Sequence, residues 1–162
     1  NACAEFVRDH QEHMNVPAHI FLVNLVSTLF MVGVIWFVQV AHYPLLTSVG
    51  EEAFVSYQHT NMRLTTWVVM PAMLVEVATA LALLKWRPDF LAVPVVWCGI
   101  ALLAVIWIST MILQVPEHNI LAKGYEAGAA NRLVQTNWIR TVAWSLRGGL
   151  LFVPLLRFLR SA

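Results

Sequence analysis

The sequence predicts an all-α integral membrane protein in which four transmembrane helices form an up-down bundle and a single domain. Apolar residues make up 59% of the 162 residues, above the roughly 45–50% that is usual for soluble proteins. Charged residues make up only 12%. The chain also contains four apolar runs close to the roughly 20 residues that a helix needs to cross the hydrocarbon core. Such a chain cannot cover its surface with charge, so a bilayer is its expected solvent.

The four predicted spans are residues 18–42, 64–84, 90–115 and 134–156. The fourth span would insert poorly by itself because it contains several polar side chains, which need partners on other helices. These are Gln135, Asn137, Arg140, Ser145 and Arg147. Ala53, Phe54 and Tyr57 have helical spacing, so the second helix is expected to begin before the membrane. Pro71 is expected to bend that helix.

Four spans place both termini and the 85–89 link on one side, with residues 43–63 and 116–132 on the other. Basic residues are slightly more numerous on the first side. It carries Arg8, Lys85, Arg87, Arg157 and Arg160, against Lys123 and Arg132 on the opposite side, together with Arg63 and Arg140, which are candidates for a site and not only loop residues. The positive-inside rule therefore predicts cytoplasmic termini. In a bacterium this places the chain in the inner membrane, with the two longer segments facing the periplasm.

The partners predicted from composition are the lipid bilayer and either a hydrophobic small molecule or a larger membrane complex, with a homo-oligomer left open. The formal net charge is +1 and no basic tract is present, which excludes nucleic acid. Cys3 lies in the N-terminal polar stretch and Cys98 inside an apolar span, so they form neither a CxxC motif nor a plausible disulfide pair.

Polar residues gather at the four helix ends that meet on the side opposite the termini. They are His42, Tyr43, Tyr57, His59, Arg63, His118, Asn119, Asn137, Trp138 and Arg140. Three of the six histidines are in this group, and imidazole is a ligand for iron, copper and zinc. His42, His59 and His118 are therefore candidate ligands of a metal ion or haem, or candidate acid/base catalysts. The alternative is that they are interfacial histidines bonded to loop carbonyls.

Two arginines at the same face bear on the kind of ligand. Arg63 and Arg140 would repel a bare dication unless carboxylates intervene. They suit an anionic group instead, such as a haem propionate, a carboxylated substrate or a phenolate. The tyrosines of this face, together with Trp67 and Trp138, are interpreted first as an interfacial aromatic belt.

Helical periodicity predicts which side chains share an interior. The three predicted stripes are Asn24, Thr28, Met31, Ile35 and His42; Trp107, Met111, Gln114 and His118; and Arg140, Trp144 and Arg147. His59 and Arg63 lie one turn apart. Trp144 and Trp107 would form an apolar wall for an aromatic substrate. Gly148 and Gly149 are expected to permit close helix packing.

Glu76 and Arg147 are the ionisable residues deepest in the predicted spans. Glu76 lies 13 residues beyond Arg63, and Arg147 lies 14 beyond Leu133. At about 1.5 Å per residue both reach about 20 Å into the bilayer. Because an unpaired charge there is costly, the two are predicted to pair. The pair either locks two helices together or serves a substrate or proton.

Several of these residues resemble the anthrone-oxygenase-like family of small four-helix membrane proteins. The similarity consists of His42-Tyr43-Pro44, of Pro116 with His118-Asn119 and Leu121, and of Asn137-Trp138 with Arg140, Trp144 and Arg147. The family is named for members linked to oxygenation of polycyclic aromatic anthrones. The resemblance implies that His42, His118, Asn119, Trp138 and Arg147 line the working pocket. His59, Arg63 and Glu76 are additions from this sequence alone.

Two functions follow from these observations. The first is a cofactor-binding oxidoreductase or oxygenase for a hydrophobic substrate, with His42, His59, His118, Arg63 and Arg140 as catalytic groups. Asn119, Trp138, Trp144, Glu76 and Arg147 would then bind the cofactor. The alternative is a non-catalytic subunit of a respiratory, photosynthetic or oxygenase complex that docks a partner or anchors haem, quinone or pigment. A transporter is disfavoured because four spans are few.

Overall fold

A computed structural model describes the backbone of residues 2–161 and the side chains of residues 16–161. Its long helices are α1 (Ala2–Phe37), α3 (Glu51–Ala82), α4 (Val93–Ser109) and α6 (Ala127–Ser161). The short ones are α2 (Tyr43–Leu45) and α5 (Val115–Leu121). Four segments are long and apolar enough to cross a membrane: Val16–Ser48, Glu51–Ala82, Val93–Leu121 and Ala127–Ser161. The predicted all-helical membrane fold is confirmed.

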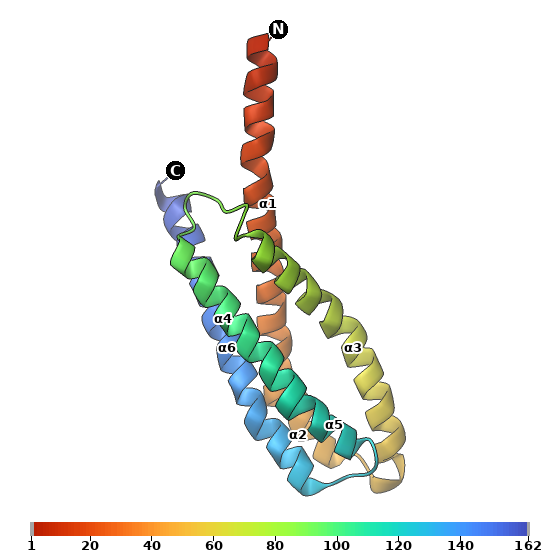
Figure 1. The fold of residues 1–162 in the computed structure, drawn as a ribbon. Helices are drawn as coiled ribbons and strands as arrows, with labels where there is room; N and C mark the ends of the chain where they lie inside the picture. The colour runs from red at the N-terminus through yellow and green to blue at the C-terminus, as the bar shows by residue number, and fades with distance from the viewer. Residues whose placement is uncertain (1, 162) are drawn as a thin grey trace.

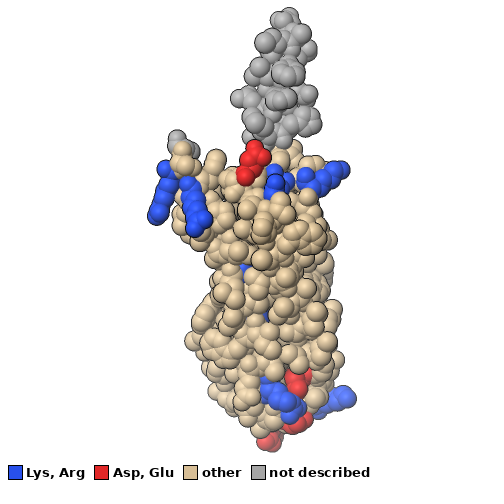
Figure 2. Space-filling view, turned by 60° about the vertical axis from the view of Figure 1, so that its left-hand side comes forward, with Lys and Arg blue, Asp and Glu red and all other residues tan. Residues whose placement is uncertain are grey.

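Both termini and the α3–α4 connection lie at one end of the bundle, and α2 and α5 lie at the other (Figure 1). We call the end with α2 and α5 the cavity end. On the face shown in Figure 2, charged side chains gather at the two ends, and the band between them is tan except for two small blue patches. That band suits the hydrocarbon core of a bilayer, where an exposed charge is costly.

The helices extend further than the apolar runs that predicted them. α3 begins at Glu51, directly after Gly50, which confirms the predicted extension of this helix before the membrane. Pro116 does not end the third span but lies in the first turn of α5, where its missing N–H is not needed. The connection from α5 to α6 therefore spans only residues 122–126.

Packing within the bundle is uneven. The buried apolar residues form three clusters along its length, and α6 contributes to all of them. In contrast, α3 buries only Phe54, Gln58, Met73, Glu76 and Ala80 of its 32 residues. In Figure 1 this helix diverges from α4 in the middle of the bundle. This sparsely buried helix forms one wall of the cavity described below.

The two adjacent glycines of α6 differ in their surroundings. A Cβ atom on Gly148 would lie 3.2 Å from Val32 Cγ2 and 3.7 Å from Leu29 Cδ2, both on α1. A Cβ atom on Gly149 would meet nothing within 4 Å. The predicted close approach is therefore made at Gly148 and not at Gly149.

Gly148→Leu is expected to destabilise the bundle by about 1–3 kcal/mol, because the larger side chain must push α1 away from α6. Gly149→Leu is the matched control, since it makes the same change in the same helix where space is open. Unfolding of the two variants in detergent measures the difference. Equal stabilities would show that the α1–α6 contact tolerates a side chain at this position.

Candidate functional site

A cavity of about 190 Å³ lies near the cavity end, between α1, α3, the α4–α5 segment and α6. Its polar lining includes His42, Tyr43, Asn61, Thr110, Gln114, His118 and Arg140. Its apolar lining includes four of the six methionines in the chain, Met31, Met62, Met70 and Met73, together with Trp144 and several valines. The polar groups lie toward the cavity end, and Met31, Met73 and Trp144 lie deeper.

Two π-helical segments bring the polar side chains to this cavity. Val38–His42 continues α1, and Thr110–Gln114 joins α4 to α5. A π turn adds a residue to the helix and changes the direction of the side chains that follow it. Tyr43 and His118 follow these segments in the chain, so the two π turns set the direction in which both side chains point. Such turns are frequent at functional sites.

Arg140 is the central group of the site. It is 8% exposed, and its guanidinium donates to Asn137 Oδ1 from Nε at 2.9 Å and from Nη2 at 2.5 Å. Nη2 also contacts Tyr43 Oη at 3.2 Å and Gln114 Oε1 at 3.3 Å. Among the side chains of residues 16–161, Nη1 has one hydrogen-bond partner, the hydroxyl of Thr110 at 3.4 Å. All these partners are neutral, and among the described residues no carboxylate pairs with Arg140 within 4.0 Å.

A second layer of contacts fixes the direction of the Arg140 guanidinium. Asn137 donates through Nδ2 to Gln39 Oε1 at 2.8 Å, which leaves its Oδ1 to accept from Arg140. Gln39 in turn donates through Nε2 to the carbonyl of Val134 at 3.2 Å. Gln39 and Asn137 are both buried. The cation is therefore held in place before any ligand binds.

His118 is tied down at both ring nitrogens. Nε2 lies 3.3 Å from Tyr43 Oη, and Nδ1 lies 3.0 Å from Gln58 Nε2. The amide of Gln58 and the hydroxyl of Tyr43 thus face the two ring nitrogens, and which of these nitrogens carries the proton depends on the tautomer. The Oε1 atom of the buried Gln58 has no partner among the described residues. Tyr43 thus joins His118 to Arg140 in one hydrogen-bonded chain.

The predicted convergence of three histidines is wrong. His42 and His118 line the cavity, but His59 is exposed and outside it, as is Arg63. The reason is helical phase: Gln58 faces inward, and a residue one position on is rotated by about 100°. Asn119 and Trp138 are also exposed and outside the cavity. Trp138 instead packs edge-on against Trp36, with ring centroids 5.7 Å apart.

The residues do not form the ligand set predicted for a metal ion or haem. Among the described residues, no group of three or more His, Cys, Asp or Glu side chains is placed to hold a metal ion. Both nitrogens of His118 are already in contact with protein atoms. Arg140 adds a positive charge beside this histidine. The electrostatics of the site therefore favour an anion over a cation.

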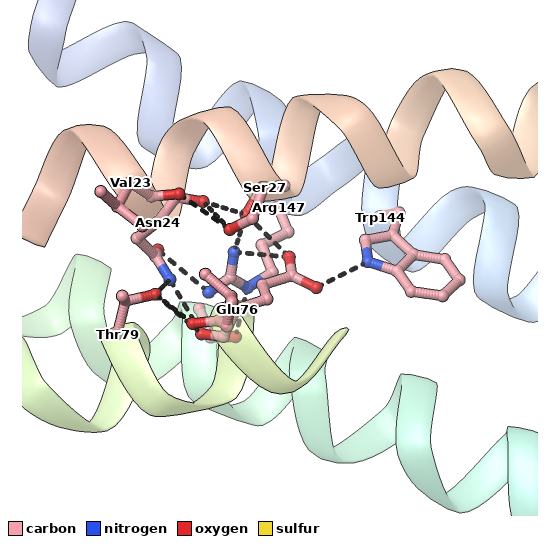
Figure 3. A network of polar contacts seen from close by, with 10 residues as sticks. Val23, Asn24, Ser27, Glu76, Thr79, Trp144 and Arg147 are labelled. Carbon is pink, nitrogen blue, oxygen red and sulfur yellow. Dashed lines mark hydrogen bonds and ion pairs between the residues drawn. The ribbon is translucent and has the colours of Figure 1, made fainter. Parts of the chain in front are cut away.

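Glu76 and Arg147 form the predicted ion pair, with Arg147 Nη1 3.0 Å from Glu76 Oε1. Figure 3 shows the network around them. Glu76 also accepts from Thr28 Oγ1 at 2.7 Å and from Trp144 Nε1 at 3.1 Å. Arg147 donates to Asn24 Oδ1 at 3.2 Å, to Thr28 Oγ1 and to the carbonyl of Gly99 at 3.1 Å.

This network joins all four spans, since its members lie on α1, α3, α4 and α6. Glu76 and Arg147 are 0% and 1% exposed, and neither lines the cavity. Their predicted role in cofactor binding is therefore not supported by their position, whereas a locking role is. Trp144 connects the two sites, because it lines the cavity and donates its indole N–H to Glu76.

The sequence interpretation placed two residues wrongly, one that lines the cavity and one that does not. Tyr43 is 4% exposed and bonded to Arg140, so it does not belong to an interfacial aromatic belt. Met111, predicted to face inward with Gln114 and His118, is 56% exposed. The π turn at Thr110–Gln114 explains this error, because it breaks the 3.6-residue period on which the stripe depended.

Comparisons of this chain with protein-family models, with curated proteins and with solved structures each find no match.

Proposed function

We propose that this chain binds a lipid-soluble molecule through an anionic oxygen, such as a carboxylate, phenolate or enolate, placed beside Arg140. The observation that carries the proposal is a buried guanidinium, without a carboxylate partner among the described residues, on the wall of a largely apolar cavity. A buried charge is expensive unless it is paired. An anionic ligand supplies the missing partner.

The free donor capacity of Arg140 supports the same ligand. Nη1 carries two N–H groups and has a single contact of 3.4 Å. A ligand oxygen could accept from it without displacing Asn137. The hydroxyl of Tyr43 and the ring of His118 lie in the same hydrogen-bonded chain and line the same cavity. The site thus offers one cation and two neutral polar groups to one oxygen-bearing end of a ligand.

The remaining walls suit the apolar body of that ligand. Met31, Met62, Met70 and Met73 line the cavity, and methionine adapts to irregular ligand shapes through its flexible, polarisable side chain. A cavity of about 190 Å³ is larger than the roughly 150 Å³ that holds a benzene ring in an engineered apolar cavity. It is large enough for a polar end and the first part of an apolar body.

The same groups support proton transfer on the bound molecule. In the tautomer that leaves Nε2 without a proton, Tyr43 would take a proton from an acidic O–H, or from a C–H beside a carbonyl, and pass its own proton to His118, while Arg140 would stabilise the oxyanion that forms. This step is compatible with an oxidoreductase or oxygenase, as the resemblance to the anthrone-oxygenase-like family implies. The catalytic groups of such an enzyme would be His118, Tyr43 and Arg140, with His42 beside them, and would not include His59 or Arg63.

Binding of two ligands that differ only in the polar end tests the proposal. Radiolabelled dodecanoate and dodecanol are titrated against the protein in lipid nanodiscs, at a pH where the carboxylate is ionised, and empty nanodiscs are subtracted. We expect one saturable site that prefers dodecanoate by at least about tenfold, equivalent to about 1.4 kcal/mol. Equal affinity for both ligands, or no saturable binding of either, would contradict an anion site.

For localisation we propose the bacterial inner membrane, with cytoplasmic termini and the cavity end in the periplasm. The terminal side carries Arg8, Lys85, Arg87, Arg157 and Arg160, and the cavity end carries Arg63, Lys123 and Arg132. The cavity end also carries Glu51, Glu52, Glu117 and Glu126. The excess of basic residues on the terminal side supports this orientation.

Single cysteines at exposed positions of the cavity end test the orientation. Ser48→Cys and Ala127→Cys, in a background with Cys3→Ser and Cys98→Ser, should react with a membrane-impermeant maleimide in intact cells, because both positions are exposed. Arg87→Cys, at the other end, should react only after permeabilisation. The reverse pattern would place the termini in the periplasm.

A further inference from the structure

An apolar groove runs along the lipid-facing side of α1 and α3, next to the cavity. Its lining on α1 begins at Leu29 and reaches His42, and its lining on α3 includes Leu64 and Val68. The 13 residues from Leu29 to His42 correspond to about 20 Å along a helix. The groove has a volume of about 630 Å³, and apart from His42 and Thr65 its lining is apolar.

The groove and the cavity share part of their lining. Val34, Val38, His42, Thr65 and Val69 line both spaces. Four of these five side chains are half-buried, and Val38 is 8% exposed. The boundary between cavity and groove is thus made of side chains from two facing helices, and a bound molecule could pass between them.

Gly33 keeps the middle of the groove open. It lines the groove, and a Cβ atom on it would meet nothing within 4 Å. Phe30 and Phe37, on either side of it in the chain, also line the groove. The space beside Gly33 is therefore large enough to admit a larger side chain, and a larger side chain would fill it.

The direction of the groove matches the orientation of an amphiphile in a bilayer. Arg140 lies two helical turns closer to the cavity end than Arg147, and His42 lies at the cavity end of the groove. The other end of the groove, at Leu29, lies beside Gly148 in the middle of the bundle. A molecule with its polar end at Arg140 would have its apolar end pointing into the hydrocarbon core.

We infer that the ligand of this site is a single-chain amphiphile, whose anionic oxygen lies beside Arg140 and whose flexible hydrocarbon chain lies in the α1–α3 groove. This inference rests on the proposed function and names the class of ligand. A linear chain fits a groove of about 20 Å by the helical rise, whereas a compact polycyclic body would stay in the cavity. Straight acyl chains and methyl-branched isoprenoid chains share this chemistry.

Hexanoate and hexadecanoate, titrated in nanodiscs, provide the test with Gly33→Leu and the matched control Gly149→Leu. Both glycines are exposed, helical and without neighbours within 4 Å of a Cβ atom, but only Gly33 lines the groove. Gly33→Leu should weaken hexadecanoate at least fivefold and leave hexanoate unchanged, because only the longer chain reaches this position. Gly149→Leu should change neither affinity. Farnesoate, an isoprenoid acid, is titrated in the same way, and whether it or hexadecanoate binds more tightly shows which kind of chain the site prefers.

A hexadecanoate with a photoreactive diazirine at its chain end gives a second, independent measurement. Crosslinks should map to Leu29, Phe30 and Val68 of the groove and should be suppressed by unlabelled hexadecanoate. Hexadecanol is titrated in the same way, and if hexadecanoate is not preferred over it, both proposals fail. If the preference holds, the anion site stands. The groove for the chain is then contradicted if Gly33→Leu has no effect and the crosslinks spread over other lipid-facing positions, such as Ile139.

Discussion

Replacing either member of the Glu76–Arg147 pair is expected to lower the free energy of unfolding by about 3–5 kcal/mol, since removal of one partner leaves the other as an uncompensated buried charge. Glu76→Gln and Arg147→Met are the two single changes. Arg147 also loses its contacts with Asn24, Thr28 and Gly99 when it is truncated. Its variant should therefore be the less stable of the two.

The double variant should recover much of the loss, because no unpaired charge then remains in the middle of the bundle. A double-mutant cycle in detergent measures the coupling energy between the two residues. Mutations at distant, independent sites are additive to within about 0.3–0.5 kcal/mol, so we expect a coupling energy well above about 0.5 kcal/mol. Arg132→Met is the control for loss of an arginine, because its ion pair with Glu117 is on the surface. Additive losses at Glu76 and Arg147 would show that each residue is stabilised by separate partners.

Arg140→Gln is expected to abolish the preference of the protein for dodecanoate over dodecanol. Loss of one partner from a buried, hydrogen-bonded charge pair costs about 2–5 kcal/mol, which corresponds to a loss of affinity for the carboxylate of about 30-fold or more. The alcohol makes no ion pair, so its affinity should change little. Arg63→Gln is the control, because Arg63 is exposed and outside the cavity.

Arg140→Gln and the variants of the Glu76–Arg147 pair should also differ in their effect on the stability of the protein. Arg140 has no carboxylate partner among the described residues, so its removal leaves no opposite charge behind, and Arg140→Gln should fold more stably than Arg147→Met. An Arg140→Gln protein that keeps its preference for dodecanoate would move the anion site elsewhere on the chain. Unfolding of these variants in detergent therefore distinguishes an arginine that binds the ligand from one that stabilises the fold.

The sequence predicted the fold and the deep ion pair well, because both depend on quantities that primary structure contains directly. Apolar length identifies a span, and counting along a helix at about 1.5 Å per residue gives depth. Glu76 and Arg147 were therefore placed at one level without knowledge of the helix positions. The partners Asn24 and Thr28 were also predicted to face inward, and both are buried.

The candidate site was predicted only in part, because the direction in which a helical side chain points is harder to predict from the sequence than its depth in the membrane. On α3 the inward stripe runs from Glu76 through Met73, Val69 and Thr65 to Gln58. Followed back from Glu76, that stripe leads to Gln58 and not to His59. Histidine is the more common ligand, but position on the helix decides what a side chain can reach.

The π turns could not be predicted from apolar periodicity. They shift the phase within α1 and between α4 and α5, and they bring Tyr43 to Arg140. No pattern in residues 38–42 or 110–114 indicates the extra residue, since apart from Gln39 and His42 in the first segment and Thr110 and Gln114 in the second, their residues are apolar and typical of an ordinary helix. The prediction that Met111 faces the interior failed for this reason, whereas the assignment of Tyr43 to an aromatic belt rested on residue type and not on helical phase.

An experimental structure of the protein with dodecanoate bound would show directly whether Arg140 holds the anion. We expect ligand density in the cavity between α1, α3 and α6, with a carboxylate oxygen at a hydrogen-bond distance of about 2.7–3.2 Å from a guanidinium nitrogen of Arg140. Val34 and Val69, which line both the cavity and the groove, should contact the hydrocarbon chain. A carboxylate that lies at the surface beside His59 and Arg63, with the cavity empty, would contradict the central claim that Arg140 is the anion site.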